Sequence, residues 1–165
     1  METMIKSVLR ILQFLLVLLT TALIGNVIAS NNTGAESAVN FIMFVCALSW
    51  ITVIYGVVSH FVSSLSIPVV ALGLDSAATL FTFIGAVVLS AKLQAVNCSN
   101  FGTKASDYIV FGSNNDEKRC REIQASTVFL WFLFASFAAS LFFVLKELRR
   151  SGGSVRGPNM SQIGV

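Results

Sequence analysis

Charged residues are scarce in this chain of 165 residues. Asp, Glu, Lys and Arg together make up 12% of it, whereas about 25% is usual in a soluble domain. Proline is also rare, with two residues, so long helices are seldom interrupted. Hydrophobic residues make up 55% of the chain and the mean hydropathy is +0.80. This composition excludes an ordinary water-soluble domain and predicts a membrane protein.

The side chains of common catalytic and metal sites are also missing. A single histidine excludes His-based metal clusters, and the three cysteines do not have the spacing of zinc ligands. No glycine-rich phosphate loop follows a predicted strand. We therefore expect a protein that is not an enzyme and needs no metal or cofactor. The expected ligands are bound lipids, and binding of nucleic acid is not expected.

Four apolar segments are long enough to cross a bilayer, because a hydrocarbon core of ~30 Å requires about 20 helical residues. They cover approximately residues 8–28, 39–62, 67–91 and 126–145. The predicted fold class is an all-α membrane protein, an antiparallel four-helix transmembrane bundle over residues 1–150, with a flexible cytoplasmic tail at 151–165. As an alternative, the first segment is a secretory signal cut after Ala29, although it exceeds the usual apolar length of such signals.

Basic residues are divided almost evenly between the two sides of the predicted bundle, so the positive-inside rule alone does not orient it. Those near the termini are Lys6, Arg10, Lys146, Arg149, Arg150 and Arg156, and those of the large loop are Lys92, Lys104, Lys118, Arg119 and Arg121. The same loop holds Cys98 and Cys120, and a pair of loop cysteines suits an oxidising compartment. We therefore place this loop outside and both termini in the cytoplasm.

The outer loops carry three further expectations. A disulfide between Cys98 and Cys120 is predicted, with two free thiols as the alternative, whereas Cys46 packs as a small apolar residue. Asn31 and Asn97 begin glycosylation sequons close to the membrane. In the stretch DYIVFG, residues 107–112, polar and apolar residues alternate briefly, which predicts a short strand over the helix ends.

Asp75 is the most unusual residue of the predicted spans. It lies ~12 Å below the inner boundary of its helix, at a depth where an isolated charge is strongly penalised. Four polar residues lie near the same depth on the other three spans, namely Gln13, Tyr55, Ser136 and Ser140. We expect an intramembrane polar site in which these groups hydrogen-bond the carboxyl group. Arg10 and His60 are expected to extend to water at the inner surface.

Small residues four apart on one helical face predict where the spans pack closely. The pairs are Thr52 and Gly56, Gly73 and Ala77, Ala135 and Ala139, and Ser136 and Ser140. The last span is rich in Phe, which indicates a lipid-facing aromatic surface beside a small-residue seam. A dedicated sterol or sphingolipid site is the alternative interpretation.

The segments VNFIMFVCALSW, YGVVSHF, ALGLDSAATLFTFIGAVVLSA and RCREIQASTVFLWF resemble the fungal non-classical export protein family, whose four spans form a MARVEL domain. The tail GPNMSQIGV is similar to that family's ending. The residues that carry the resemblance are Asn40, Met43, Phe44, Tyr55, Gly56, Asp75, Phe81, Thr82, Phe83, Cys98, Arg119, Cys120, Gln124 and Ala125.

The resemblance implies an organiser of plasma-membrane microdomains, the furrow-like eisosome domains, that responds to sphingolipid and is linked to unconventional protein export. The partners it implies are eisosome proteins and further copies of the chain, beside sphingolipid and sterol. The alternative function is a small transporter or channel centred on Asp75.

The tail residues suggest how the inner leaflet is contacted. Lys146, Arg149 and Arg150 follow the last span directly and are expected to bind anionic lipids, since each basic residue near such a leaflet is worth about 1 kcal/mol. Ser151 and Ser154 beside them are candidate phosphorylation sites. Phosphates there would release the tail.

Overall fold

Four long helices account for most of the protein. The structure is a computed structural model that describes residues 2–32, 37–62, 67–94, 96–100 and 108–150. The helices are α1 Glu2–Ala29, α2 Ser37–Phe61, α3 Pro68–Leu93 and α4 Asp116–Arg150. Each is long and apolar enough to cross a membrane. The predicted all-α four-helix bundle is therefore confirmed.

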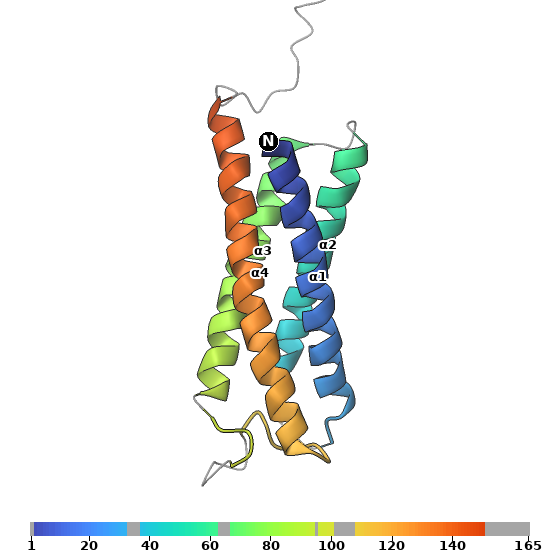
Figure 1. Ribbon diagram of the computed structural model, residues 1–165, viewed down its shortest axis with the longest axis vertical. Helices are drawn as coiled ribbons and strands as arrows, with labels where there is room; N and C mark the ends of the chain where they lie inside the picture. Colours follow the sequence, from blue (N-terminus) through green and yellow to red (C-terminus); the bar gives the residue numbers. More distant parts are fainter. Residues whose placement is uncertain (1, 33–36, 63–66, 95, 101–107, 151–165) are drawn as a thin grey trace, which may run out of the picture.

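The helices form an antiparallel ring (Figure 1). Each of α1 and α3 packs against both α2 and α4, so that α1 and α3 face each other across the bundle without direct backbone packing. The beginning of α1 and the end of α4 lie at the same end of the bundle, and the loops between α3 and α4 lie at the other (Figure 1). These are called the terminal end and the disulfide end below.

Two helices extend well beyond the predicted spans. α4 begins at Asp116, ten residues before its apolar segment, and α1 begins at Glu2. The early start of α4 has a local cause, because Asp116 and Glu117 lie in its first turn, where acidic groups favour the helix dipole. Ion pairs one turn apart, such as that of Arg121 with Glu117, add to it. A search for apolar segments does not detect such a polar helical extension.

The predicted strand at residues 107–112 is wrong for its described part. Residues 108–111 form a turn closed by a hydrogen bond from Phe111 N to Tyr108 O at 2.9 Å. Ser113 instead makes an isolated bridge to Asn31, just after α1. The apolar residues of this segment are Tyr108, Ile109 and Val110, and they are buried over the helix ends. Burial of the side chains therefore explains the apolar pattern without a strand.

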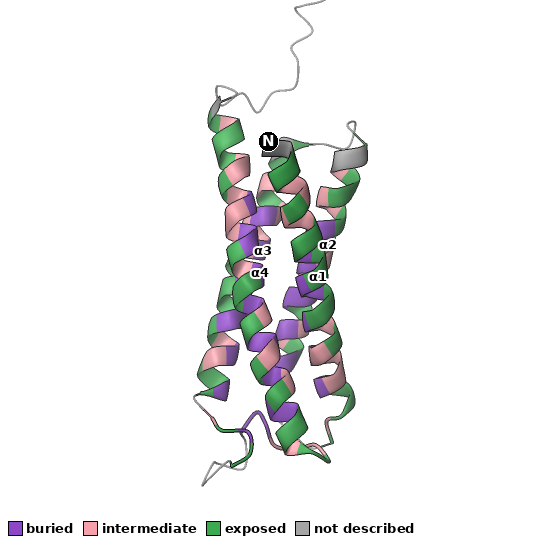
Figure 2. Ribbon diagram, viewed as in Figure 1, coloured by how far each residue is buried: buried purple, intermediate pink, exposed green. Residues whose placement is uncertain are grey.

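The buried residues line the inside of the ring, and exposed ones cover its circumference (Figure 2). Only part of the predicted small-residue packing follows this division. Ser136 and Ser140 are buried and Thr52 and Gly56 face inward, but Gly73 is exposed, and a Cβ built on it would meet nothing within 4 Å. The spacing of small residues identifies one helical face but does not show whether that face meets a helix or lipid.

On α4 the structure supports the expected division of aromatic and small residues in part. Phe132 and Phe142 are exposed, while Ser136 and Ser140 face the interior. Phe137 is an exception, because it is fully buried between them. The seam of α4 therefore contains one large aromatic side chain as well as small residues.

Candidate functional site: an ion-pair network within the bundle

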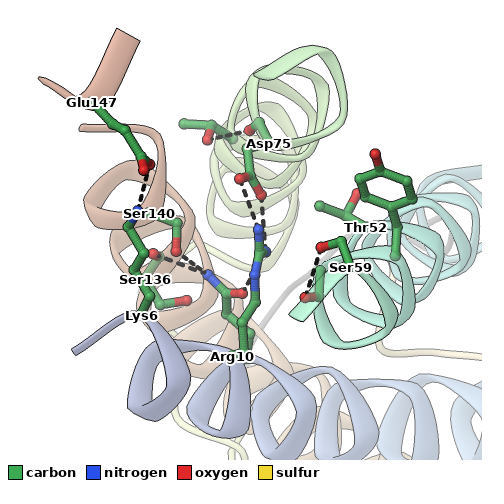
Figure 3. Close-up of polar contacts among 12 residues, drawn as sticks. Lys6, Arg10, Thr52, Ser59, Asp75, Ser136, Ser140 and Glu147 are labelled. Carbon is green, nitrogen blue, oxygen red and sulfur yellow. Dashed lines mark hydrogen bonds and ion pairs between the residues drawn. The ribbon is translucent and has the colours of Figure 1, made fainter. Parts of the chain in front are cut away.

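Asp75 forms a two-pronged ion pair with Arg10. Nη1 of Arg10 donates to Oδ1 at 2.9 Å and Nη2 donates to Oδ2 at 2.8 Å. The carboxylate is fully buried and the Arg10 side chain is 17% exposed. Parallel hydrogen bonds of this kind are the strongest form of carboxylate recognition. Arg10 lies on α1 and Asp75 on α3, so the pair ties together the two helices that do not pack directly (Figure 3).

The expectation that Arg10 extends to water is therefore wrong. Its side chain turns inward because the fully buried Asp75 carboxylate offers a bidentate partner, which outweighs hydration at the rim. The side chain of His60, the other basic group expected at that surface, lies outside the described residues. The sequence contained one signal for the correct partner, since Arg10 and Asp75 are the only Asp, Glu, Lys or Arg residues within the four predicted spans.

Gly56 on α2 makes room for the guanidinium. A Cβ built at this position would lie 2.4 Å from Nε of Arg10 and 2.6 Å from Cζ. A side chain at this position would require the Arg10 guanidinium to move, so the glycine of α2 provides the space in which Arg10 reaches Asp75. Gly56 thus has a specific packing role, whereas the spacing of small residues alone predicted only general helix contact.

Gln13 connects the pair to α4. Its Oε1 accepts from Nη1 of Arg10 at 2.9 Å, and its Nε2 donates to Oγ of Ser140 at 2.8 Å and to the backbone oxygen of Ser136 at 3.1 Å. The Ser136 hydroxyl donates to Leu133 O at 2.7 Å. Four of the five residues expected at the intramembrane site, Asp75, Gln13, Ser136 and Ser140, are thus brought together, with Arg10 as the link between them (Figure 3).

Tyr55, the fifth, is engaged at the start of α3. Its hydroxyl accepts from Ile67 N at 3.2 Å and donates to Ile67 O at 3.3 Å. It therefore ties α2 to the first residues before α3.

The network is electrically neutral and lies about two helical turns inside the bundle, because Arg10 and Asp75 follow the first residues of α1 and α3 by eight and seven positions. Lys6, four residues before Arg10, pairs at 2.5 Å with the exposed Glu147 on α4, which places a second ion pair ~6 Å nearer the terminal end. Among the described residues, every buried polar side-chain atom has a hydrogen-bond partner. The arrangement therefore satisfies charges that would be costly in lipid and joins the four helices near their terminal end.

At the disulfide end a second set of contacts holds the loops. Cys98 and Cys120 form the predicted disulfide, with Cα atoms 5.6 Å apart, and Cys46 is free and buried, as expected. Next to Cys120, the buried Arg119 donates from Nε to Ile109 O at 3.1 Å and from Nη1 to Val27 O at 3.2 Å. Arg119 therefore fixes the turn after residue 108 and the end of α1 onto α4. Its burial is not expected from the sequence, because the predicted spans place Arg119 in the large loop rather than on α4.

Tyr108 adds a further tie from the loop. Its hydroxyl donates to Leu93 O at the end of α3, and burial raises the pKa of Tyr108 above its ordinary value. The phenol therefore keeps its proton, and with it the hydrogen bond, throughout the neutral range.

The two sequon residues differ in environment. Asn31 accepts from Nη1 of Arg119 at 2.9 Å and is part of the loop packing. Asn97 is exposed, and its Oδ1 accepts from Ser99 N at 3.1 Å. Glycosylation at either position stays a prediction.

Of the basic residues expected at the inner leaflet, Lys146 and Arg149 are exposed on the last turns of α4. The Arg150 side chain, Ser151, Ser154 and the whole predicted tail lie outside the described residues. Lipid binding and phosphorylation there stay predictions.

Comparison with known proteins agrees with this architecture. The model of the MARVEL family, a membrane-associating domain, matches residues 3–143 and so includes all four helices. Non-classical export protein 2 of Saccharomyces cerevisiae is 32% identical over 99% of this chain and 100% of its own length. Non-classical export protein 102 of Candida albicans is 33% identical over 88% of this chain and 84% of its own. No solved structure matches.

The match to the family begins at residue 3, and α1 supplies two of the five hydrogen-bonded residues of the network, Arg10 and Gln13. The first helix is therefore part of the family domain. From the four antiparallel helices, the length of the family match and the two relatives, one of which matches over its full length, we conclude that the chain is a multi-pass membrane protein of the MARVEL family, in its group of fungal non-classical export proteins.

Proposed function

We propose that the protein organises microdomains of the plasma membrane, the furrow-like eisosome domains, and responds there to sphingolipid. We also propose a link to unconventional protein export, which the names of its relatives support. In this role it is not an enzyme. Its termini lie in the cytoplasm, and its partners are membrane lipids, including sphingolipid and sterol, further copies of the chain and eisosome proteins.

One observation carries this proposal. Every buried polar side-chain atom of the described residues is satisfied within the protein, and both Asp75 oxygens are used by Arg10. Within the part of the chain that the structure describes, the interior therefore leaves no buried polar side-chain atom without a partner to be taken up by a substrate. What the chain presents to its surroundings is the circumference of four apolar helices, with large exposed residues such as Ile51, Leu80 and Phe132. Its exposed side chains are therefore suited to contact lipid, which favours a membrane organiser over a transporter.

The experiment is to image a tagged copy of the protein in cells before and after sphingolipid depletion. We expect discrete plasma-membrane clusters that redistribute when sphingolipid synthesis is blocked. A copy that stays evenly spread, or clusters that ignore the depletion, would contradict the proposal.

The alternative, a small transporter or channel, rests on the ionisable pair inside the membrane. Asp75→Asn keeps a hydrogen-bonding oxygen for Arg10 but removes the titratable group. We expect purified wild-type protein in vesicles to show no proton-dependent flux. A flux that is present in the wild type and lost in Asp75→Asn would favour the alternative.

The cytoplasmic tail is a proposed regulator of this association. Lys146, Arg149 and Arg150 would hold it on anionic lipid, and phosphates on Ser151 and Ser154 would add negative charge and release it. The test compares Ser151→Glu/Ser154→Glu with the double alanine variant for binding to anionic vesicles and for clustering. Equal behaviour in both assays would leave the tail as an anchor only.

A further inference from the structure

A groove between α1 and α4 at the disulfide end has a different chemistry from the rest of the lipid-facing surface. Its floor is apolar and contains Leu23 of α1 and Ala125 of α4. Its rim is charged and is formed by one stretch of α4, with Glu117, Lys118, Arg121 and Glu122. The groove thus passes from charged to apolar within two to three helical turns. This is the profile of the interface between headgroups and hydrocarbon.

The rim charges are only partly used by the protein. Lys118 and Arg121 lie three residues apart on α4, and both side chains are 65% exposed. The Lys118 ammonium is 3.7 Å from Oε1 of Glu122, which is too long for a hydrogen bond. Arg121 uses one nitrogen, Nη2, in an ion pair with Glu117 at 2.5 Å. Two adjacent cations with N–H donors left over can bind a phosphate.

Glu122 supplies an acceptor beside them. Its Oε1 accepts from Nδ2 of Asn26 at 2.6 Å, which fixes the carboxylate at the junction of α1 and α4. No described residue hydrogen-bonds its Oε2, and because no buried side-chain oxygen lacks a partner, that atom is accessible. A fixed carboxylate oxygen beside two cations suits a ligand that carries hydroxyl groups as well as a phosphate.

The surface below the groove indicates that this ligand is a lipid. One turn farther into the membrane, the same faces of α1 and α4 continue as exposed apolar residues, Leu19 four residues from Leu23, and Val128 and Phe132 three and seven residues from Ala125. A soluble phosphate would not use this path, whereas an acyl chain attached to the headgroup would lie along it.

We propose that this groove binds the headgroup of a lipid that carries both a phosphate and hydroxyl groups, such as a ceramide phosphoinositol, in the leaflet at the disulfide end. Lys118 and Arg121 bind the phosphate, Glu122 accepts from a hydroxyl group, and Leu23 and Ala125 contact the start of the chain. The inference deepens the proposed function, on which its biological meaning rests, by naming where a sphingolipid would be recognised.

The test measures lipid retained by the purified full-length protein in mild detergent, by native mass spectrometry, after incubation with one of three lipids. These are ceramide phosphoinositol, phosphatidylcholine as a phosphate without hydroxyl groups, and glucosylceramide as hydroxyl groups without a phosphate. We expect the first to be retained best. Equal retention of all three would overturn the proposal.

Two variants separate the groove from general surface charge. Lys118→Gln/Arg121→Gln removes the phosphate donors, and Ala125→Phe fills the floor without changing charge. The matched control is Lys92→Gln, which removes an exposed basic residue at the same end, on α3. We expect Lys118→Gln/Arg121→Gln to retain ceramide phosphoinositol roughly 25-fold more weakly, since each cation beside an anionic headgroup is worth about a factor of five. Ala125→Phe should also retain it more weakly, because the added ring fills the floor, and the control should behave as wild type.

Wild-type retention in the groove variants, or an equal loss in the control, would overturn the inference. The substituted rim residues Lys118 and Arg121 are exposed and their ion pairs contribute little to folding, so an intact disulfide and an unchanged unfolding temperature should accompany the loss of lipid. The proposed function is tested separately by clustering in cells. Its failure would leave the binding result unaffected.

Discussion

The two partners of the central ion pair, Arg10 and Asp75, differ in whether their charged groups can reach water when the other partner is removed. Arg10 is partly exposed and lies four residues from Lys6, so its long side chain can reach the terminal end if its partner is lost. Asp75 is fully buried on a short side chain and has no such route. Removing one partner therefore should not have the same effect as removing the other.

We predict that Arg10→Leu, which strands Asp75, destabilises the protein by about 3 to 5 kcal/mol, the usual cost of an uncompensated buried charge. Asp75→Leu should cost clearly less, because Arg10 can turn outward. The double variant Arg10→Leu/Asp75→Leu should be close to wild type. Unfolding temperatures of the purified proteins in one detergent provide the measurement, and equal losses in the two single variants would refute this account.

Two glycines allow a matched test of the space beside Arg10. Gly56→Ala would place a methyl group 2.4 Å from Nε of Arg10 and should displace the guanidinium from Asp75, at a cost of about 1 to 3 kcal/mol. Gly73→Ala meets nothing within 4 Å and should be neutral or stabilising by up to about 1 kcal/mol, because alanine favours a helix. The unfolding temperatures should move in opposite directions or only that of Gly56→Ala should fall.

At the scale of elements, the disulfide end depends on one covalent tie and one arginine. The disulfide joins the segment after α3 to the first turns of α4, and Arg119 joins that part of α4 to the end of α1 and the turn after residue 108. The loop therefore acts as a cap that fixes the ends of three helices.

We predict that the double variant Cys98→Ser/Cys120→Ser remains a four-helix protein but loses about 3 kcal/mol of stability, from the entropy of a loop with a sequence separation of 22 residues. Thermal unfolding with and without reductant provides the measurement. The wild type should lose stability when reduced, whereas the double variant should not respond. A response of the variant to reductant would show that the effect does not arise from this disulfide.

At the scale of the whole molecule, the ring of helices places the start of α1 and the end of α4 at one end and the disulfide at the other. Short connections between consecutive helices make neighbours antiparallel. The position of each end relative to the membrane then follows from a single measurement of sidedness.

We predict that Lys146→Cys, at the terminal end, is protected from a membrane-impermeant maleimide in intact cells, whereas Asn114→Cys, in the loop before α4, is labelled. Both residues are exposed, so a difference reports sidedness rather than burial. After permeabilisation both should react. Labelling of Lys146→Cys alone in intact cells would invert the proposed orientation.

The four helices could be predicted from the amino-acid sequence, and the two loop cysteines favoured the disulfide over two free thiols. Apolar length is a local property, and a membrane leaves a helix as the main way to satisfy the backbone of such a segment. The two cysteines of the one large loop had few other partners. Asp75, Gln13, Ser136 and Ser140 were also recognisable as one site, because depth along a helix can be counted from the chain.

Which groups meet within that depth could not be read from the sequence. Arg10 was assigned to water and Tyr55 to the carboxylate, whereas the bundle turns Arg10 inward over Gly56 and leaves Tyr55 at Ile67. The reason is that the rotation of each helix about its axis cannot be counted from the chain. Depth follows from residue number, but the direction of a side chain around its helix, and the choice of a diagonal partner across the ring, are set by how all four helices pack.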